Sequence, residues 1–315
     1  LSHFGFHDRA GNHYAIAHQR HFLGLIGKSR LEWTVAAHAI FEGTPNIFAE
    51  LNFPMYIDNL ADGTLVVSNF GDARIYRIDV GRRKAELFVD GTAIGMADAG
   101  NCVVDDEGLV WVNEVKGCRI WRFDSRGELV LTLGDGKPAF QSGEVDFDAA
   151  RFNWIYDMRR GPDGNIYVLD SRNFAVRSVD LKRRVVNTIA GTGKAGYEGD
   201  GGDALRATFG SDPAARFDGP ISLSMDEDGN VFVGDRMNHV VREIHRKSGI
   251  IETVAGNHNS VKGIGSDPEE RDPLKLNLPE ISSMDYWDGQ LFIPTDLSPE
   301  VGELAVLRRA PVKYG

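Results

Sequence analysis

The chain has 315 residues, a formal net charge of −11, and 42% hydrophobic and 26% charged residues. This composition is that of a globular protein, and the acidity excludes a broad nucleic-acid-binding face, because phosphate binding needs clustered Lys and Arg. No apolar run approaches the roughly 18 residues of a membrane-spanning helix, so we expect no membrane partner. We expect a soluble protein; the compartment stays open, with a lean toward a secreted or periplasmic location.

Glycines that each follow a polar turn and precede a strand-like run recur at spacings of 45 to 65 residues. They are Gly11, Gly63, Gly108, Gly164, Gly229 and Gly289. The runs that follow them are His13–Ala17, Leu65–Ser68, Leu109–Asn113, Ile166–Leu169, Val231–Gly234 and Leu291–Pro294. Aromatic and β-branched residues bounded by Gly, Asp and Asn are typical of β-strands.

Three further runs complete each repeat. A shorter apolar run precedes each glycine, as in Cys102–Asp105, a third run follows the next turn, as in Arg74–Ile78, and a fourth ends the unit, as in Val185–Ala190. Four consecutive antiparallel strands repeated at this period predict a β-propeller blade. No segment sustains a helical period, which excludes a helical solenoid.

The sequence therefore predicts an all-β, six-bladed β-propeller of four-stranded antiparallel blades, forming a single domain over residues 1–315. The expected blades cover approximately residues 1–37, 50–90, 100–134, 152–191, 219–256 and 279–315. At the two ends, His3–His7 is the expected inner strand of the first blade and Pro311–Tyr314 the expected fourth strand of the last. How the ring closes is left open.

Two segments carry a resemblance to a known repeat family. The segment Asp226–Arg242 contains Gly229-Asn230, Asp235 and Asn238-His239, and Gly164–Arg177 is a second copy with Asp170 and Asn173. Both resemble NHL repeats, and the resemblance implies the same propeller fold. NHL propellers include protein-interaction domains, RNA-binding domains and lyases, so the resemblance leaves the function open.

One residue in each repeat ends the second strand, and by symmetry these residues form a ring on one face of the disc. They are Ala17, Asn69, Glu114, Asp170, Asp235 and Thr295. Asp and Asn at such positions often cap the following turn through its backbone N–H groups. Because Glu is a longer and poorer cap, Glu114 is the carboxylate that we single out for a functional role.

Basic and aromatic side chains follow this ring in the same turns. We assign Glu114, Asp170, Arg172 and Arg236 as candidate catalytic residues, and Asn69, Asp235, His18, His21, His239 and Tyr156 as candidate ligand-binding residues. Guanidinium, imidazole and carboxylate groups together suit an anionic or polyhydroxylated small molecule. The histidines lack the close spacing of zinc motifs, so a divalent metal cofactor stays an alternative only.

Three connections between repeats are long, at residues 134–151, 191–219 and 256–279. The second begins with the Gly191-Thr192-Gly193 phrase and continues through Gly199–Gly202. Long loops without internal structure are commonly lids over a site, so we expect these three to cover the ring. Calcium binding at the Gly-Asp stretches is the alternative, although the spacing of an EF-hand loop is absent.

Cys102 and Cys118 either form a single disulfide or stay free, since two cysteines make no disulfide framework. No nucleophile elbow, phosphate loop or dinucleotide fingerprint occurs. We therefore expect an NHL-type propeller that binds a small polar or anionic ligand on the lidded face. The alternatives are a lyase or hydrolase acting there through carboxylate or histidine acid-base chemistry, and a protein-interaction scaffold.

Overall fold

Strands and short 3-10 turns make up the structure, a computed structural model. It describes residues 52–79, 82, 84–211, 219–260, 267, 270–298 and 301–308, and in the first fifty residues the backbone of four strands. Those four strands are β1 (Phe4–His7), β2 (His13–Ala17), β3 (Phe22–Ile26) and β4 (Trp33–Val35). They pair in chain order as one antiparallel sheet.

The next two sheets are antiparallel meanders of four strands each. The first contains β5 (Pro54–Asn59), β6 (Leu65–Asn69), β7 (Arg74–Asp79) and β8 (Lys84–Asp90). The second contains β9 (Cys102–Val104), β10 (Val110–Glu114), β11 (Arg119–Phe123) and β12 (Leu129–Leu133). The 3-10 turn η2 (Gly91–Ile94) lies in the short connection between them.

Two further sheets have five strands, because a strand from the preceding connection pairs with the outermost strand of the meander. The first contains β13 (Glu144–Asp146), β14 (Ile155–Arg160), β15 (Ile166–Asp170), β16 (Ala175–Asp180) and β17 (Val185–Ala190). The second contains β18 (Gly202–Asp203), β19 (Ser222–Met225), β20 (Val231–Asp235), β21 (Val240–Ile244) and β22 (Ile250–Gly256). The 3-10 turns η3 (Phe147–Ala149), η4 (Ser171–Asn173), η5 (Ala204–Arg206), η6 (Arg236–Asn238) and η7 (Pro273–Lys275) lie in the connections and turns.

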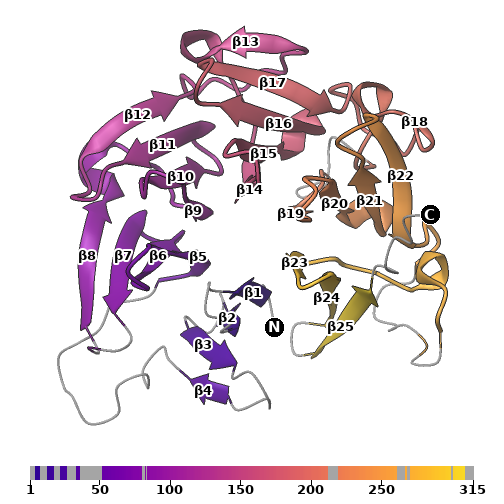
Figure 1. The fold of residues 1–315 in the computed structure, drawn as a ribbon, viewed down its shortest axis with the longest axis horizontal. Helices are drawn as coiled ribbons and strands as arrows, with labels where there is room; N and C mark the ends of the chain where they lie inside the picture. The colour runs from indigo at the N-terminus through magenta and orange to yellow at the C-terminus, as the bar shows by residue number, and fades with distance from the viewer. Residues whose placement is uncertain are drawn as a thin grey trace.

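The last sheet has three described strands, β23 (Asp285–Trp287), β24 (Gln290–Ser298) and β25 (Val301–Arg308). The sheets stand around a common centre, with β1, β5, β9, β14, β19 and β23 innermost (Figure 1). The predicted all-β propeller of antiparallel sheets is confirmed. Six equal blades of four strands are not found among the described residues, where five sheets have four or five strands and the last has three. The expected strand Pro311–Tyr314 lies outside the described residues.

The repeated glycine that opens each long connection has a steric cause. Gly134, Gly191 and Gly256 end the outer strands at φ values of 88°, 98° and 81°. A Cβ atom on them would lie 2.6, 2.1 and 2.3 Å from the carbonyl oxygens of Cys118, Phe174 and His239 respectively. Only glycine allows this close approach of two backbone segments together with a left-handed φ. The repeated phrase is therefore a packing feature of the scaffold.

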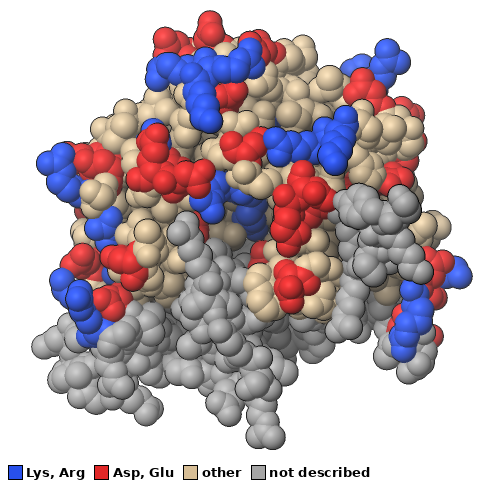
Figure 2. All heavy atoms as spheres, viewed as in Figure 1, with Lys and Arg blue, Asp and Glu red and all other residues tan. Residues whose placement is uncertain are grey.

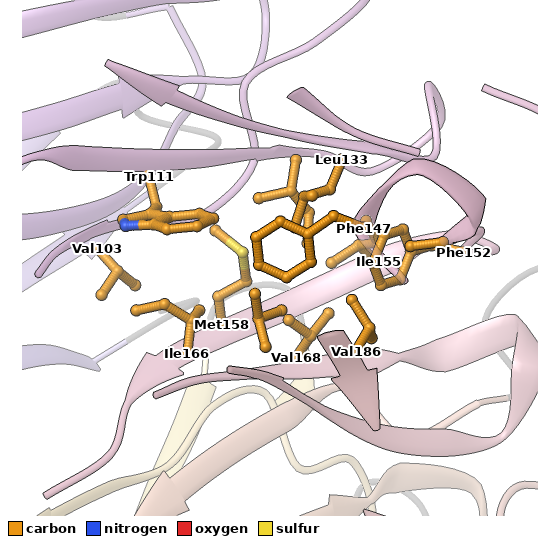
Figure 3. Packing of buried hydrophobic residues seen from close by; sticks show 13 residues of the cluster. Val103, Trp111, Leu133, Phe147, Phe152, Ile155, Met158, Ile166, Val168 and Val186 are labelled. Atoms are coloured by element: carbon orange, nitrogen blue, oxygen red, sulfur yellow. The ribbon is translucent and has the colours of Figure 1, made fainter. Parts of the chain in front are cut away.

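Neighbouring sheets pack face to face through buried apolar clusters. The cluster between the β9–β12 and β13–β17 sheets contains Val103, Trp111, Leu133, Phe147, Phe152, Ile155, Met158, Ile166, Val168 and Val186, among others (Figure 3). Phe152 comes from the connection before β14 and is 0% exposed. Radial packing of this kind explains why apolar residues occur on both faces of these strands.

Replacing Phe152 with alanine should lower the free energy of unfolding by about 3–5 kcal/mol, because the buried ring leaves a cavity between two sheets. Urea denaturation measures the effect. The control is Leu129→Ala on β12, where the side chain is 45% exposed and the expected loss is about 0.5–1 kcal/mol. Equal losses for the two variants would contradict the packing described here.

Candidate functional site

The carboxylates that end the second strands are fully buried and hold the connection that enters their own sheet. Glu114, Asp170 and Asp235 are each 0% exposed. Their oxygens accept backbone N–H groups of Ala97 at 2.5 Å, Asn153 at 2.7 Å and Gly210 at 3.0 Å respectively. All three acids therefore attach an incoming connection to the scaffold.

Glu114 was expected to cap the turn after its strand poorly, and its backbone bond goes instead to Ala97, in the connection before β9. Its longer side chain reaches the Ala97 N–H with Oε1, while Oε2 accepts from Trp121 Nε1 at 3.0 Å and lies 3.4 Å from Arg119 Nη1. Both oxygens thus have protein donors. A catalytic role for Glu114 stays a prediction, and its surroundings do not separate it from the structural acids of the other sheets.

Asp170 and Asp235 share one further feature, since each accepts a hydrogen bond from the side chain of the asparagine three residues later in the chain. Asp170 Oδ2 accepts from Asn173 Nδ2 at 2.9 Å, and Asp235 Oδ2 accepts from Asn238 Nδ2 at 2.8 Å. Burial outweighs these bonds and raises the pKa of both carboxyl groups to about 6. The NHL-like Asp and Asn residues are consequently explained by turn and connection geometry.

The remaining predicted site residues each have their own local contacts or positions. Arg172 lies 4.2 Å from the Trp154 ring centroid, Arg236 Nη2 pairs with Glu280 at 2.5 Å, and half-buried Tyr156 lies where β14 shifts register against β15. His239 ends η6 at φ 61°, and buried Asn69 ends β6. His18 and His21 lie outside the described residues. None of the described members lines the cavity described below, and their functional roles stay predictions.

Two of the expected lids are attached to the outer edge of the disc. β13 and β18 interrupt the connections 134–151 and 191–219, so the expectation of loops without internal structure is wrong. In the second connection, Asp200 Oδ1 accepts from Arg242 Nε at 2.9 Å and Oδ2 accepts from Thr253 Oγ1 at 2.6 Å. Asp200 therefore fixes its Gly-Asp stretch to β21 and β22. Nothing in this arrangement favours calcium.

The two cysteines are free and buried, so no disulfide joins Cys102 and Cys118. Burial raises the pKa of the Cys102 thiol to about 12 and also raises that of Cys118, which keeps both protonated. In the part of the chain that the structure describes, no group of three or more His, Cys, Asp or Glu residues could hold a metal ion. No helix among these residues is long and apolar enough to cross a membrane.

A cavity of about 220 Å³ opens between the inner strands, in the channel of the propeller. It is lined by Tyr56, Asp58, Val103, Arg159, Arg160, Ser224, Met225, Asp285, Tyr286 and Trp287. These residues come from β5, β9, β14, β19 and β23, one inner strand from each of five sheets. The volume equals that of about seven water molecules. A ligand smaller than a typical drug molecule would fill it.

The cavity lies toward the opposite end of the channel from the predicted site. In the β14–β15 register, Ile155 is opposite Asp170, whereas Arg160, which lines the cavity, is opposite Ile166. One residue on each of these inner strands occupies an equivalent position. It pairs with the residue of the second strand that comes three positions before that strand's predicted site residue, such as Asp170 on β15. These residues are Asp58, Val103, Arg159, Ser224 and Asp285. All five line the cavity, so the strands present them to the channel.

A network of hydrogen bonds around buried Asp157 lies next to these five residues, two positions before Arg159 on β14. Asp157 accepts bonds from Arg159 Nη1, from Asn101 Nδ2 and from the Leu223 N–H at 2.8 Å. The Arg159 guanidinium lies 4.5 Å from the Tyr56 ring centroid. Side chains from several sheets therefore meet at the centre, where an isolated buried charge would be costly.

Asp58 is the carboxylate of the cavity that the sequence interpretation missed. Its oxygens accept the N–H groups of Val104 and Asn59, each at 2.7 Å, and its side chain is half-buried. Desolvation raises its pKa to about 6 despite these bonds. The sequence does hold a pattern that could have predicted these channel residues. Polar residues at 56 and 58 alternate with an apolar residue at 57, and polar residues at 157 and 159 alternate with an apolar residue at 158. This period of two marks one face of an inner strand as polar.

Charges of both signs are mixed over the face drawn in Figure 2, with Lys and Arg atoms in the shaded hollow near its centre. No large field of one sign covers the described part of this face.

Solved structures with this fold include binding proteins and enzymes. An auxiliary nutrient binding protein from Bacteroides ovatus aligns with a TM-score of 0.65 and 16% identity, over 96% of this chain and 68% of that one. A luciferin-regenerating enzyme aligns at 0.60 and 12%, over 98% and 90% of the two chains. Virginiamycin B lyase from Staphylococcus aureus aligns at 0.55 and 12%, over 98% and 85%. Such low identities establish the β-propeller fold alone.

At the level of sequence, the chain is 34% identical over 87 residues to the Arabidopsis thaliana protein SUPPRESSOR OF QUENCHING 1, chloroplastic. The matched part is 28% of this chain and 7% of that protein. No family model matches the chain.

Asp235→Asn should change how stability depends on pH. The carboxyl of Asp235 has a pKa near 3.8 when unfolded and about 6 when folded, so the native state keeps its proton to higher pH. Its contribution to stability therefore falls as pH rises from about 4 to about 6, by up to about 3 kcal/mol, and is constant above. Urea denaturation from pH 4 to 8 should show that the variant lacks this fall.

The control for this experiment is Asp124→Asn on an exposed turn. Backbone hydrogen bonds, that from Glu128 first, lower the pKa of Asp124, so its contribution is lost as pH falls. The two variants should therefore differ from the wild type with opposite pH slopes. Parallel slopes for both would contradict the assignment of a raised pKa to Asp235.

Proposed function

We propose that this chain is an NHL-type, six-bladed β-propeller that binds a small polar molecule in the channel cavity. The observation that carries the proposal is the set of equivalent channel residues on five inner strands. This set gives one cavity two aspartates, an arginine and a serine. Few, convergent polar groups beside aromatic side chains are typical of small-molecule sites. On this proposal β23–β25 is the sixth blade, and the whole chain is one domain.

The channel is preferred to the opposite end because its polar groups face an open space. Asp58, Arg159 and Asp285 line the cavity and Asp58 is half-buried, whereas Glu114, Asp170 and Asp235 are 0% exposed. The similarity to nutrient-binding propellers supports a binding role. The likeness to an extracellular domain from Bacteroides thetaiotaomicron supports a location outside the cytoplasm as part of the proposal.

Trp287→Leu should weaken binding of the ligand at least tenfold, because Trp287 has the largest side chain among the residues that line the cavity. We would screen neutral polyols, amino acids, amines and carboxylates of up to about ten non-hydrogen atoms by ligand-observed NMR. At least one of these chemical classes should bind.

Arg172→Ala tests the opposite end of the channel in the same assay, and Leu129→Ala on the outer strand β12 is the control. We expect both to bind as the wild type does. Loss of binding in Arg172→Ala with none in Trp287→Leu would place the site at the opposite end. Absence of binding by every class would overturn the proposal.

A second candidate function is a lyase or hydrolase in the same cavity. The raised pKa of Asp58, about 6, suits a carboxylate that accepts a proton near neutral pH. Arg159, on the equivalent position of β14, could stabilise a developing oxyanion. The predicted roles of Glu114, Asp170, Arg172 and Arg236 in such chemistry are tested by the same assays.

Turnover of esters, lactones or uronates by the wild type, with at least a hundredfold lower kcat in Asp58→Asn, is the result expected of such an enzyme. Continuous release of acid at pH 7 is the measurement. Thermal unfolding of the variant controls for loss of structure. Turnover that survives in Asp58→Asn but is lost in Glu114→Gln would instead assign the chemistry to the opposite end.

A further inference from the structure

We propose that the ligand of the channel cavity is a small organic ammonium ion. This inference rests on the proposed binding function and adds the charge of the ligand. Three observations support it: the balance of charge around the cavity, the environment of Asp58, and the aromatic lining.

The groups around the cavity carry more negative than positive charge. Among the described residues, the lining and its ion-pair partners hold the four aspartates Asp58, Asp106, Asp157 and Asp285 against the two arginines Arg159 and Arg160. The lining itself holds two aspartates and two arginines, and the surplus of two negative charges comes from Asp106 and Asp157, which pair with the arginines from outside the lining. Arg159 pairs with Asp157 and Arg160 with Asp106, so neither arginine is reserved for an anionic ligand.

Asp58 is the acidic group best placed to meet a cation. It is half-buried against the cavity and accepts only backbone N–H groups, and within the described part of the chain it forms no ion pair. Desolvation raises its pKa even though the charges of Arg160 and Arg159 act in the opposite direction, so the two arginines compensate the buried carboxylate only in part. A bound organic ammonium group would supply a further positive charge beside this carboxylate.

Aromatic rings complete a site of this chemistry. Tyr56, Tyr286 and Trp287 line the cavity, and the Phe232 ring stacks on Tyr286 with centroids 5.7 Å apart, which fixes the orientation of Tyr286. Ring faces attract cations, Trp most strongly, and the Arg159 guanidinium already lies over Tyr56. A bare Ca²⁺ or Mg²⁺ ion fits less well, since each takes six or more oxygen ligands.

Choline and its neutral isostere 3,3-dimethylbutan-1-ol test the charge of the ligand directly, because they have the same shape. Isothermal titration calorimetry at pH 7.5 should show choline binding at least tenfold more tightly. Asp58→Asn and Trp287→Leu should each weaken choline binding at least fivefold. Asp124→Asn, on a remote exposed turn, should bind choline as the wild type does.

The two variants keep the test decisive if one of them fails to fold, since Trp287→Leu leaves the hydrogen bonds of Asp58 intact. Equal affinity for the two probes would overturn the ammonium assignment, as would binding of acetate or Ca²⁺ in place of choline, while each leaves a ligand site in the channel. Absence of binding by every probe would overturn this inference and the proposed function together.

Discussion

The buried Asp157 carboxylate is the interaction on which the centre of this molecule depends. It accepts bonds from Arg159 on its own strand, from Asn101 before β9 and from the backbone of Leu223 on β19. These partners belong to three consecutive sheets, so one charged group connects three inner strands. A buried ion pair stabilises little by itself, but leaving one partner unpaired is costly. The network therefore favours a single arrangement of the strands around the channel.

A second set of acids acts at the rim in the same way. Glu114, Asp170 and Asp235 each attach the connection that enters their own sheet, and Arg242 attaches one connection further through Asp200. Polar contacts thus determine the path of the chain between sheets, whereas apolar clusters hold the sheets together. Because the rim acids are engaged by the scaffold, the inner strands carry the groups that still face an open space.

The glycine spacing and strand composition predicted the propeller and most strand positions, since both arise from local chemistry. The same reasoning predicted the ring of strand-end residues from Asn69 to Thr295, but it could not show that these residues are buried. The burial of these residues depends on connections such as residues 147–154, which pack against the strand ends in the folded protein although they are distant from them in the sequence. Pairing of β13 and β18 with outer strands was missed for the same reason, because a two- or three-residue strand has no periodicity to detect.

The channel residues could have been found in part. Tyr56, Asp58, Asp157 and Arg159 interrupt runs that the prediction treated as apolar inner strands, and their alternation marks a polar face. Sequence could not show that Asp58 accepts a bond from the next sheet, or that Asp157 and Arg159 pair with each other, because these contacts depend on how neighbouring inner strands converge. Predicting these contacts would have required knowing how the inner strands converge on the channel.

The outward course of β13 and β18 has a consequence for how the chain could be rearranged. A new pair of termini within the connection 134–151 or 191–211 would detach an edge strand from the following sheet. The connection from β8 to β9 contains η2 and no pairing strand, so a cut there would separate two complete meanders. Circularly permuted or split forms of this protein should therefore tolerate an opening near residue 93 and resist one near residue 145.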